Sequence, residues 1–474
     1  MKNINKKLQI LLLLPLIAVQ IKCGSSKSTV SHSGKAASWI TTTDETSKLK
    51  KQPDLVFNSD TNSNQTITVD ASQKFQTIEG FGFSLTGGSA QAILKLDKAK
   101  REALLQELFS RKDDAVGLSY LRISIGASDL NETVFSYDDM PAGQTDLKLE
   151  HFNLGPDLKD VVPVLKEILA INPKIKIMGS PWSPPVWMKD NGSSKGGSLQ
   201  PKYYQVYAEY FVKYIQAMKA QGIVIDAITP QNEPLHPGNN PSMLMLAEQQ
   251  ADFIGNNLGP AFKAAGIKTK IIVYDHNCNK PEYPLTILKD PKANPFVAGS
   301  AFHLYEGDIS ALTTVHNAFP DKDLYFTEQY TGSGSSFEND LKWGVKNVVI
   351  GSMRNWSKIA LSWGLANDEN YKPFTPGGCS TCKGALMIDQ NQNVKREVGY
   401  YLIGHASKFV PEGSVRIGSN IAGNLHNVAF KTPSGQIVLI VENDGASAET
   451  FNIKYNQKQI TTTLSAGAAA TYVW

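Results

Sequence analysis

Short apolar runs alternate with helix-patterned stretches through the centre of the chain, and this alternation limits the fold more than any other feature. Within 203–220, for example, Tyr207, Tyr214 and Met218 follow helical spacing. Eight runs have strand character: 80–85, 120–125, 175–180, 225–230, 270–274, 298–305, 323–328 and 359–366. The pattern predicts an α/β protein with a closed (β/α)8 TIM barrel over residues 79–394. An open doubly wound sheet is the alternative, because periodicity does not prove closure.

Both ends of the body have a different pattern. From residue 415 to 474, strand-like runs follow one another with turns between them and no helical run. Residues 52–78 have the same character and precede the barrel. The simplest arrangement joins 52–78 and 395–474 into one accessory antiparallel β-sandwich.

The first 22 residues predict an export signal. Lys6 and Lys7 precede the apolar run 8–21, which is shorter than the ~20 residues of a membrane-spanning helix. Cys23 follows directly and resembles the lipidated cysteine of bacterial lipoproteins, although Lys22 stands where that motif prefers a small residue. We therefore expect an outer-membrane or cell-surface lipoprotein. The alternative is an ordinary cleaved signal peptide and a periplasmic or secreted protein.

Residues 23–51 are rich in Ser, Thr and Lys, which predicts a solvated tether between the leader and the body. The chain has 47 Lys and Arg against 44 Asp and Glu, a formal charge of +3. Four of the lysines lie before Cys23, and removing these four charges from +3 leaves −1 for the rest. A nearly neutral body offers no basic surface for nucleic acid, so an uncharged partner is expected.

The remaining cysteines predict a structural role. In an exported chain, the pair Cys379 and Cys382 favours a disulfide that closes a small loop. A zinc site would need a second pair of ligands at suitable spacing, and the sequence has none. We expect no metal and no cofactor.

Two predicted strands end in glutamates with polar neighbours. Glu233 follows the fourth strand and Glu328 ends the seventh. In a (β/α)8 barrel the carboxyl ends of the strands surround one mouth, so these carboxyls can face each other. Glycoside hydrolysis needs one protonated and one ionised carboxyl. The alternative for either residue is a solvated loop charge, which is less convincing for two such residues than for one.

Aromatic residues near the same strand ends suit a sugar ligand. Trp182 follows the third strand and Trp363 ends the eighth, and pyranose rings stack on such indole faces. Arg122 ends the second strand, with Asp129 just beyond it, and both can hold hydroxyl groups. A structural salt bridge is an equally good interpretation of Arg122.

Histidines and further polar residues follow the fifth and sixth strands. His303 and Tyr305 can orient a nucleophile, although a core histidine bonded to backbone is the alternative. Asp275 and His276 are able to bind metals, but neighbouring strand residues point to opposite faces. We interpret these two as loop polarity.

Seven sequence blocks resemble glycoside hydrolase family 30, which includes lysosomal glucosylceramidase, and they follow in order through about residues 55–474. The blocks are Ile-Glu-Gly-Phe-Gly (78–82), Leu-Arg-Ile-Ser (121–124), Gly-Ser-Pro-Trp-Ser-Pro-Pro (179–185), Gln-Asn-Glu-Pro (231–234), Phe-His-Leu-Tyr (302–305), Phe-Thr-Glu (326–328) and 404–414. The resemblance implies retaining hydrolysis of β-linked glucosides on a barrel with a side sandwich. It implies Glu233 as acid/base, Glu328 as nucleophile and Asn232 as partner of the sugar 2-hydroxyl. The implied subsite residues are Arg122, Asp129, Trp182, Tyr305 and Trp363.

Within that family, residues 232–243 and 381–384 are most similar to the β-1,6-glucanase branch. The segment after Glu233 is shorter than the aromatic-containing loop of glucosylceramidases. The expected function is therefore endo-β-1,6-glucanase activity on a β-glucan. A glucosylceramidase-like β-glucosidase and a non-catalytic glycan-binding lipoprotein are the alternatives, although a pure binder does not need two such carboxyls.

Overall fold

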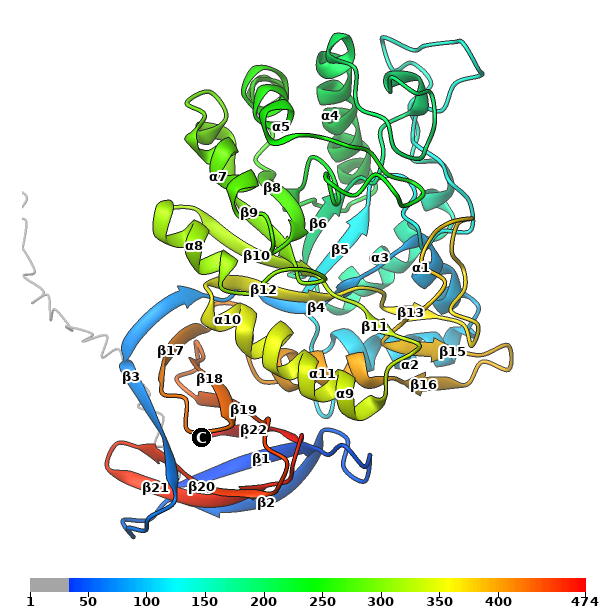
Figure 1. Cartoon of the computed structure of the whole chain (residues 1–474). Coiled ribbons are helices and arrows are strands. Elements are labelled where there is room, and N and C mark those ends of the chain that lie inside the picture. The colour runs from blue at the N-terminus through cyan, green and yellow to red at the C-terminus, as the bar shows by residue number, and fades with distance from the viewer. Residues whose placement is uncertain (1–33) are drawn as a thin grey trace, which may run out of the picture. The chain divides into compact units, whose positions relative to one another are not determined.

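Eight parallel strands close into a barrel in the computed structural model, which describes residues 34–474 (Figure 1). In barrel order they are β10 (Asp323–Glu328), β12 (Ser357–Ser362), β4 (Gly80–Ser84), β5 (Tyr120–Ser124), β6 (Lys176–Ser180), β7 (Ala227–Ile228), β8 (Lys270–Asn277) and β9 (Val297–His303). Each coincides with one of the eight predicted strands. The prediction of a closed barrel is confirmed, and the open sheet is excluded.

Helices follow the strands and cover the outside of the barrel. They are α1 (Gly87–Leu94), α2 (Lys98–Phe109), α3 (Val161–Ile171), α4 (Tyr204–Ala220), α5 (Ala247–Phe253), α6 (Gly259–Ala264), α7 (Glu282–Lys289), α8 (Ala311–Ala318), α9 (Phe337–Gly344), α10 (Ser352–Arg354) and α11 (Val398–Ser407). In α4 the predicted apolar stripe is buried, including Tyr207, Tyr214 and Met218. Among residues 34–474, no helix has both the length and the apolar character needed to cross a membrane.

Alternate side chains of the barrel strands point inward and form their own apolar cluster. Its members are Tyr120, Met178, Ala227, Ile272, Ala301, Tyr325, Ile359 and Leu361. Because side chains on a strand alternate with a period of two, the next inward positions lie two residues later. Along β5 and β9 and just beyond β7, these positions are Arg122, His303 and Thr229, and all three are buried. The strand pattern therefore places a polar layer directly above the apolar layer.

Strands from both chain ends form a second, nine-stranded sheet. Its order is β2 (Lys50–Val56), β1 (Lys35–Thr41), β22 (Ala469–Val473), β19 (Ile437–Asn443), β18 (Leu425–Lys431), β17 (Val415–Ser419), β3 (Gln65–Thr77), β20 (Glu449–Tyr455) and β21 (Lys458–Leu464). The long strand β3 pairs with β17 along one half and with β20 along the other. The sheet thereby folds over its own core, in which Phe451 meets Tyr472 at 6.3 Å between ring centroids. The predicted sandwich is confirmed, with one exception to its antiparallel order, the parallel pair β3–β20.

The structure moves two predicted boundaries. The tether expected at 23–51 contains β1 and the first two residues of β2. The local sequence alone does not reveal β1, because the strand is completed by pairing with β22, at the other end of the chain. Helix α11, placed in the sandwich by the expected boundary at 395, packs on β4 and β12 of the barrel as well as on β22 of the sandwich.

His405 on α11 joins the barrel to both chain ends. Its Nε2 lies 2.8 Å from Thr41 Oγ1 on β1, and its Nδ1 lies 2.9 Å from Thr471 Oγ1 on β22. The predicted signal peptide, residues 1–22, and the predicted lipidation site, Cys23, lie outside the described residues.

Two small sheets lie among the loops that follow the barrel strands. One pairs β11 (Thr331–Gly332) with β14 (Cys382–Lys383), and the other joins β13 (Ala366–Asn367), β15 (Leu386–Ile388) and β16 (Val394–Arg396). The predicted disulfide between Cys379 and Cys382 closes the loop that leads into β14. These loops, together with those after β5 to β7, surround the mouth of the barrel.

Candidate active site

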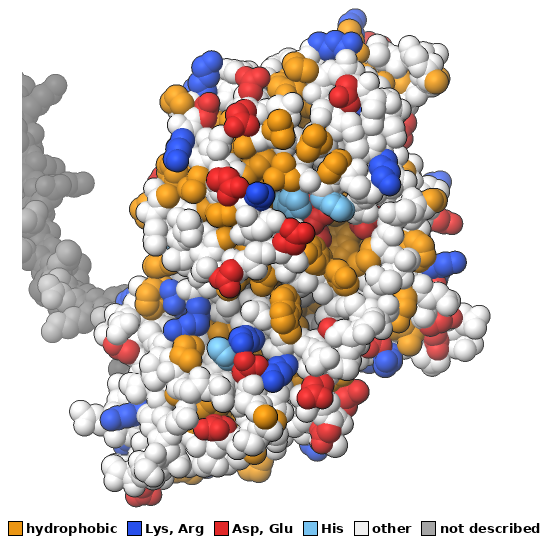
Figure 2. Space-filling view, in the orientation of Figure 1, with side chains coloured by type: hydrophobic (Ala, Val, Ile, Leu, Met, Phe, Trp, Pro, Cys, Tyr) orange, Lys and Arg blue, Asp and Glu red, His pale blue; other side chains and the backbone are white. Residues whose placement is uncertain are grey.

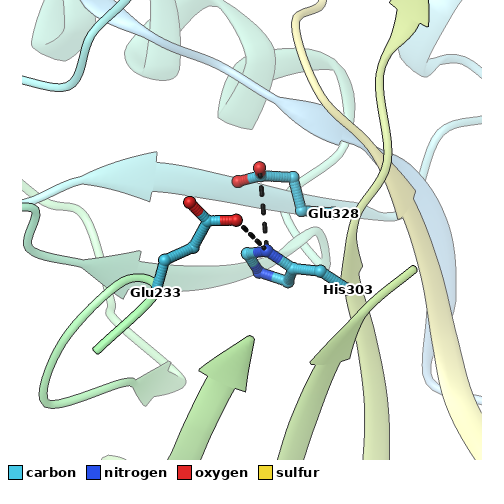
Figure 3. Close-up of side chains that lie close together, drawn as sticks. All are labelled: Glu233, His303 and Glu328. Carbon is cyan, nitrogen blue, oxygen red and sulfur yellow. Dashed lines mark hydrogen bonds and ion pairs between the residues drawn. The ribbon is translucent and has the colours of Figure 1, made fainter. Parts of the chain in front are cut away.

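The two predicted glutamates face each other at the carboxyl ends of β7 and β10. Glu328 is the last residue of β10, and Glu233 lies in the loop after β7. Figure 3 shows both carboxyl groups turned toward the imidazole of His303. One oxygen of each glutamate and one nitrogen of His303 all lie within 4.8 Å of one another. The glutamates are therefore close enough to act on the same bond.

The backbone at Glu233 has a conformation that L-residues rarely adopt, with φ of 45°. Two hydrogen bonds hold it there: Asn232 N–H donates to the Pro181 carbonyl at 2.8 Å, and Glu233 N–H donates to the Asp275 carbonyl at 3.0 Å. Strain of this kind persists only where the surroundings fix it, and it is common at functional sites. Here it turns the Glu233 side chain back over the barrel mouth.

Glu328 accepts hydrogen bonds from two side chains. Arg122 Nη1 donates to its Oε2 at 2.7 Å, and the Tyr305 hydroxyl donates to its Oε1 at 3.0 Å. Arg122 is fully buried, so its charge is poorly screened by water. Both donors favour the ionised form of Glu328.

Asp275 connects the polar residues of the mouth, so its interpretation as loop polarity is wrong. Its side chain is fully buried and accepts from Arg122 Nη2 at 2.7 Å and from His303 Nε2 at 3.1 Å. Three hydroxyl groups also donate to it, those of Ser180, Thr229 and Thr327. Burial alone would raise the pKa of Asp275, but Arg122 and the hydrogen bonds hold it well below its usual range.

A bulge in β8 explains why the sequence pattern missed Asp275. The register with β9 shifts between Tyr274 and His276, and Tyr274 and Asp275 have φ of 75° and 62°. A bulge adds a residue on one strand and so changes which side chain points inward. Regular alternation after Ile272 would have directed Tyr274 inward, whereas the bulge directs Asp275 there.

His303 links both glutamates to this network. Its Nδ1 lies 3.1 Å from Glu233 Oε1 and 3.7 Å from Glu328 Oε1. Burial alone would lower the pKa of His303, but the charge of Glu328 and the bonds to Asp275 and Glu233 raise it to about 9. The imidazole is therefore a cation at neutral pH, and both of its ring nitrogens are hydrogen-bond donors. Glu233, His303 and Glu328 are also close enough together to surround an ion.

The carboxyl groups of Glu233 and Glu328 titrate together and share one proton. Burial raises the pKa of Glu328 to about 7 against the opposing charges of His303 and Arg122. Burial also acts on Glu233, but its bond to His303 and the charge of that ring lower its pKa. Groups this close titrate as a pair. The pair consequently carries one proton up to about neutral pH.

The two predicted tryptophans form one wall of the site. The rings of Trp182 and Trp363 lie 5.1 Å apart and are 2% and 4% exposed. The guanidinium carbon of Arg122 lies 4.9 Å from the Trp182 ring, a cation–π distance. Asn232 accepts from Arg122 Nη2 at 2.6 Å, which fixes its carboxamide. An enclosed aromatic wall beside fixed polar groups is typical of a sugar-binding pocket.

Asp129 contacts the disulfide loop, where the backbone N–H of Cys379 donates to its Oδ2 at 3.3 Å. Burial, with the charge of Glu233 nearby, raises the pKa of Asp129 to about 6. The structure thus gathers the predicted catalytic and substrate-binding residues at one mouth. Besides Asp275, the sequence reasoning missed Ser180, Thr229 and Thr327. The period of two along β6, β7 and β10 is the signal that could have found them.

A (β/α)8 barrel with two facing glutamates, an aromatic wall and a buried arginine at its mouth defines a glycoside hydrolase. Comparison with known families agrees. The model of the glycosyl hydrolase family 30 TIM-barrel domain matches residues 78–410, and that of the family's β-sandwich domain matches residues 413–472. The chain belongs to glycosyl hydrolase family 30.

Individual relatives of this chain include two kinds of enzyme. An endo-1,6-β-D-glucanase of Neurospora crassa is 38% identical over 403 residues, which cover 81% of this chain and 82% of the relative. The lysosomal acid glucosylceramidase of Mus musculus is 29% identical over 434 residues, covering 86% and 83%. A solved endo-β1,6-glucanase superposes with a TM-score of 0.86 at 36% identity, covering 93% of this chain and 99% of its own.

Proposed function

We propose that this protein is an exported, retaining endo-β-1,6-glucanase. The observation that carries the proposal is the pair Glu233 and Glu328, with one oxygen of each within 4.8 Å. Retaining glycosidases place their carboxyls about 5–5.5 Å apart, whereas inverting enzymes leave about 6.5–9.5 Å for a water molecule. The similarity to endo-1,6-glucanases supports the choice of substrate.

The hydrogen-bond donors support the assignment of roles. Glu328, with Arg122 and Tyr305 donating to it, is the nucleophile, because a nucleophile must be ionised. Glu233 is the acid/base, because His303 is the one side chain bonded to it among the described residues and its other oxygen is open to a leaving group. Asn232, held by Arg122, is placed beside Glu233 to bind the sugar 2-hydroxyl.

The order of the pKa values of the two glutamates is opposite to these roles, since Glu328 has the higher value. Two cations, Arg122 and His303, face three carboxyls, those of Asp275, Glu233 and Glu328. This hydrogen-bonded network has one net negative charge when all three carboxyls are ionised, and a single proton on the glutamate pair neutralises it. His303 Nδ1 lies near both glutamates and offers a path for that proton to reach Glu233.

Two displacements complete the reaction. First, Glu328 attacks the anomeric carbon while Glu233 gives its proton to the glycosidic oxygen, and the leaving sugar departs. Glu233, now ionised, then takes a proton from water, whose oxygen attacks the same carbon and releases Glu328. Two inversions at one carbon restore the original β configuration.

The test is hydrolysis of a linear β-1,6-glucan, measured as released reducing ends, with β-1,3-glucan and glucosylceramide as comparisons. Proton NMR of the first products should show the β anomer. Release of the α anomer would contradict the retaining mechanism. Preferred cleavage of glucosylceramide would favour the glucosylceramidase-like alternative, which the mouse relative supports. Tight calorimetric binding of glucan without cleavage would favour the binding lipoprotein.

Export and anchoring form a separate part of the proposal. The basic and apolar order of residues 1–22, followed by Cys23, supports export with a lipid anchor at that cysteine. Replacing Cys23 with Ser should move the protein from the membrane fraction to the soluble fraction, with glucanase activity retained. An unchanged membrane fraction would contradict the anchor.

A further inference from the structure

A hollow of about 720 Å³ opens beside the nucleophile and is not used by the chemistry described above. Tyr305, which donates to Glu328, forms its inner end. Tyr330 follows, with its ring centroid 5.3 Å from that of Tyr305. Trp343 on α9 lines the same hollow. Figure 2 shows hydrophobic, histidine and acidic side chains gathered around a hollowed region on this face.

Trp343 is 42% exposed, and it is the one tryptophan among the exposed large hydrophobic residues of the described chain. Exposing an indole to water is unfavourable, because burying apolar area yields roughly 25 cal/mol per Å². Trp182 and Trp363 in the catalytic pocket are almost completely buried. Trp343 therefore has an apolar face available to a ligand that enters the hollow.

Polar side chains complete the lining of the hollow: Ser333, Ser335, Asn339 and Thr381. Hydroxyl and amide groups next to aromatic faces suit a carbohydrate, which offers both apolar ring faces and many hydroxyls. A lipid chain would contact few aliphatic side chains beside Trp343 and Tyr330. The lining thus favours sugar units over an acyl tail.

The outer wall is fixed before any ligand binds. Ser333 N–H donates to the Thr381 carbonyl at 2.8 Å, next to the β11–β14 pair. Lys383 Nζ lies 3.3 Å from Asp340 Oδ2, and this ion pair joins β14 to α9. The disulfide between Cys379 and Cys382 closes the loop that carries Thr381. A preformed wall lowers the entropic cost of binding a flexible chain.

We propose that this hollow binds glucose units on the leaving-group side of the cleaved bond, with Trp343 as their stacking platform. The inference rests on the proposed glucanase function. The pocket formed by Trp182 and Trp363 is enclosed and accepts the sugar that is attacked. The hollow is open and begins at Tyr305, so it receives the part of the chain that departs.

The experiment compares the full-length wild type with Trp343→Ala, Trp343→Phe and a matched control, Ile421→Ala. Ile421 is also 42% exposed and belongs to the turn between β17 and β18 in the sandwich. Substrates are an aryl β-glucoside, whose small leaving group does not reach Trp343, and β-1,6-linked glucose oligomers of increasing length. Thermal unfolding confirms that each variant is folded.

The wild-type kcat/KM should rise with oligomer length. Trp343→Ala should lower kcat/KM by about tenfold on the longest oligomers and leave the aryl glucoside unchanged, while Trp343→Phe and Ile421→Ala stay near wild type. In oligomers labelled at the reducing end, cleavage by Trp343→Ala should move toward that end, because fewer leaving-side units are held.

Three outcomes would overturn the inference: equal losses on both substrate classes, no loss on long oligomers, or a shift of cleavage toward the non-reducing end. Loss on glucosylceramide alone would identify the hollow as a lipid site instead. Failure of the proposed function is separate and is visible in the wild type, as cleavage of the aryl glucoside without cleavage of β-1,6-glucan.

Discussion

The two ends of the barrel use the same residue types in opposite ways. At the carboxyl end, Arg122, Asp275 and His303 are completely buried and joined by hydrogen bonds of 2.7–3.1 Å. At the amino end, Lys270 pairs with Glu79 at 2.8 Å, but 38% and 18% of their side chains are exposed. Further pairs there, such as Lys358 with Asp323 at 3.1 Å, are also partly open to water.

The difference shows that burial, more than pairing, determines what an ion pair does. Water and salt screen the charges at the amino end, where such pairs contribute roughly 0–1 kcal/mol each. Buried charges at the carboxyl end cannot be screened, so they alter one another's pKa values and order the reacting groups. The same barrel thus carries chemistry at one end and modest stability at the other.

Replacing Glu328 with Gln should have the largest effect. The amide keeps the size of the side chain but cannot attack the anomeric carbon, so turnover of an aryl β-glucoside should fall by more than ~10³-fold. Binding of β-glucan, followed by calorimetry, should be nearly retained. Wild-type rates for this variant would show that Glu328 is not the nucleophile.

Asp275→Asn should come next, with kcat lowered by ~10²-fold because Arg122 and His303 lose the group that positions them. Removing one partner of a buried ion pair also costs about 3–5 kcal/mol of folding free energy. The pKa of His303 should fall, because a carboxylate that raises it is gone. An NMR titration of the histidines measures this fall, and an unchanged His303 would contradict the network.

The pH profile tests the charges of the carboxyl end directly. Because the pKa of Glu328 is raised to about 7, the glutamate pair keeps its proton below that pH and loses it above. The kcat/KM for an aryl β-glucoside should therefore decrease about tenfold per unit on the alkaline side of neutrality. Asp129→Asn should move this limb to lower pH, because the charge of Asp129 helps to raise the pKa of Glu328. A flat profile up to pH 9 would refute the shared proton.

The smallest effect is expected from Glu79→Gln, which makes at the amino end the same chemical change as Glu328→Gln. The rate and its pH profile should stay as in the wild type, with a stability loss of at most ~1 kcal/mol. Burial would raise the pKa of Glu79, but Lys270 and Lys358 lower it. The contribution of ionised Glu79 to the free energy of unfolding is thus fully present above pH 4.5 and is lost as the pH falls through the lowered pKa of Glu79. Denaturant unfolding at pH 7 and pH 3 measures it, and a large rate loss would remove the contrast between the two ends.

The barrel and the sandwich could be predicted because their patterns are local. Runs such as 271–274, Ile-Ile-Val-Tyr, are apolar along their length, which is typical of strands buried on both faces. Strand β1 was missed because its pattern is short and lies among Ser, Thr and Lys residues. Its pairing with β22 joins Ala37 to Val473, a contact that no local sequence window contains.

For the active site, the sequence indicated Arg122 and Glu328, which belong to clear strands, and Glu233, which follows another predicted strand. It left open whether Arg122 was a ligand-binding group or a structural ion pair. The structure shows that Arg122 is both a buried ion-pair partner and a donor to Glu328. The two interpretations were not exclusive, because one guanidinium can donate to several acceptors at once.

By itself, the sequence determined the order of strands and helices, the family and the identity of the two glutamates, since spacing and residue type record those properties. Only the tertiary structure decided that Asp275 joins the site and that His303 bridges the carboxyls. A bulge in β8 turns Asp275 inward, and barrel closure brings β7, β9 and β10 together around His303. Side-chain direction at a bulge and contacts between distant strands depend on packing in three dimensions, which no single segment encodes.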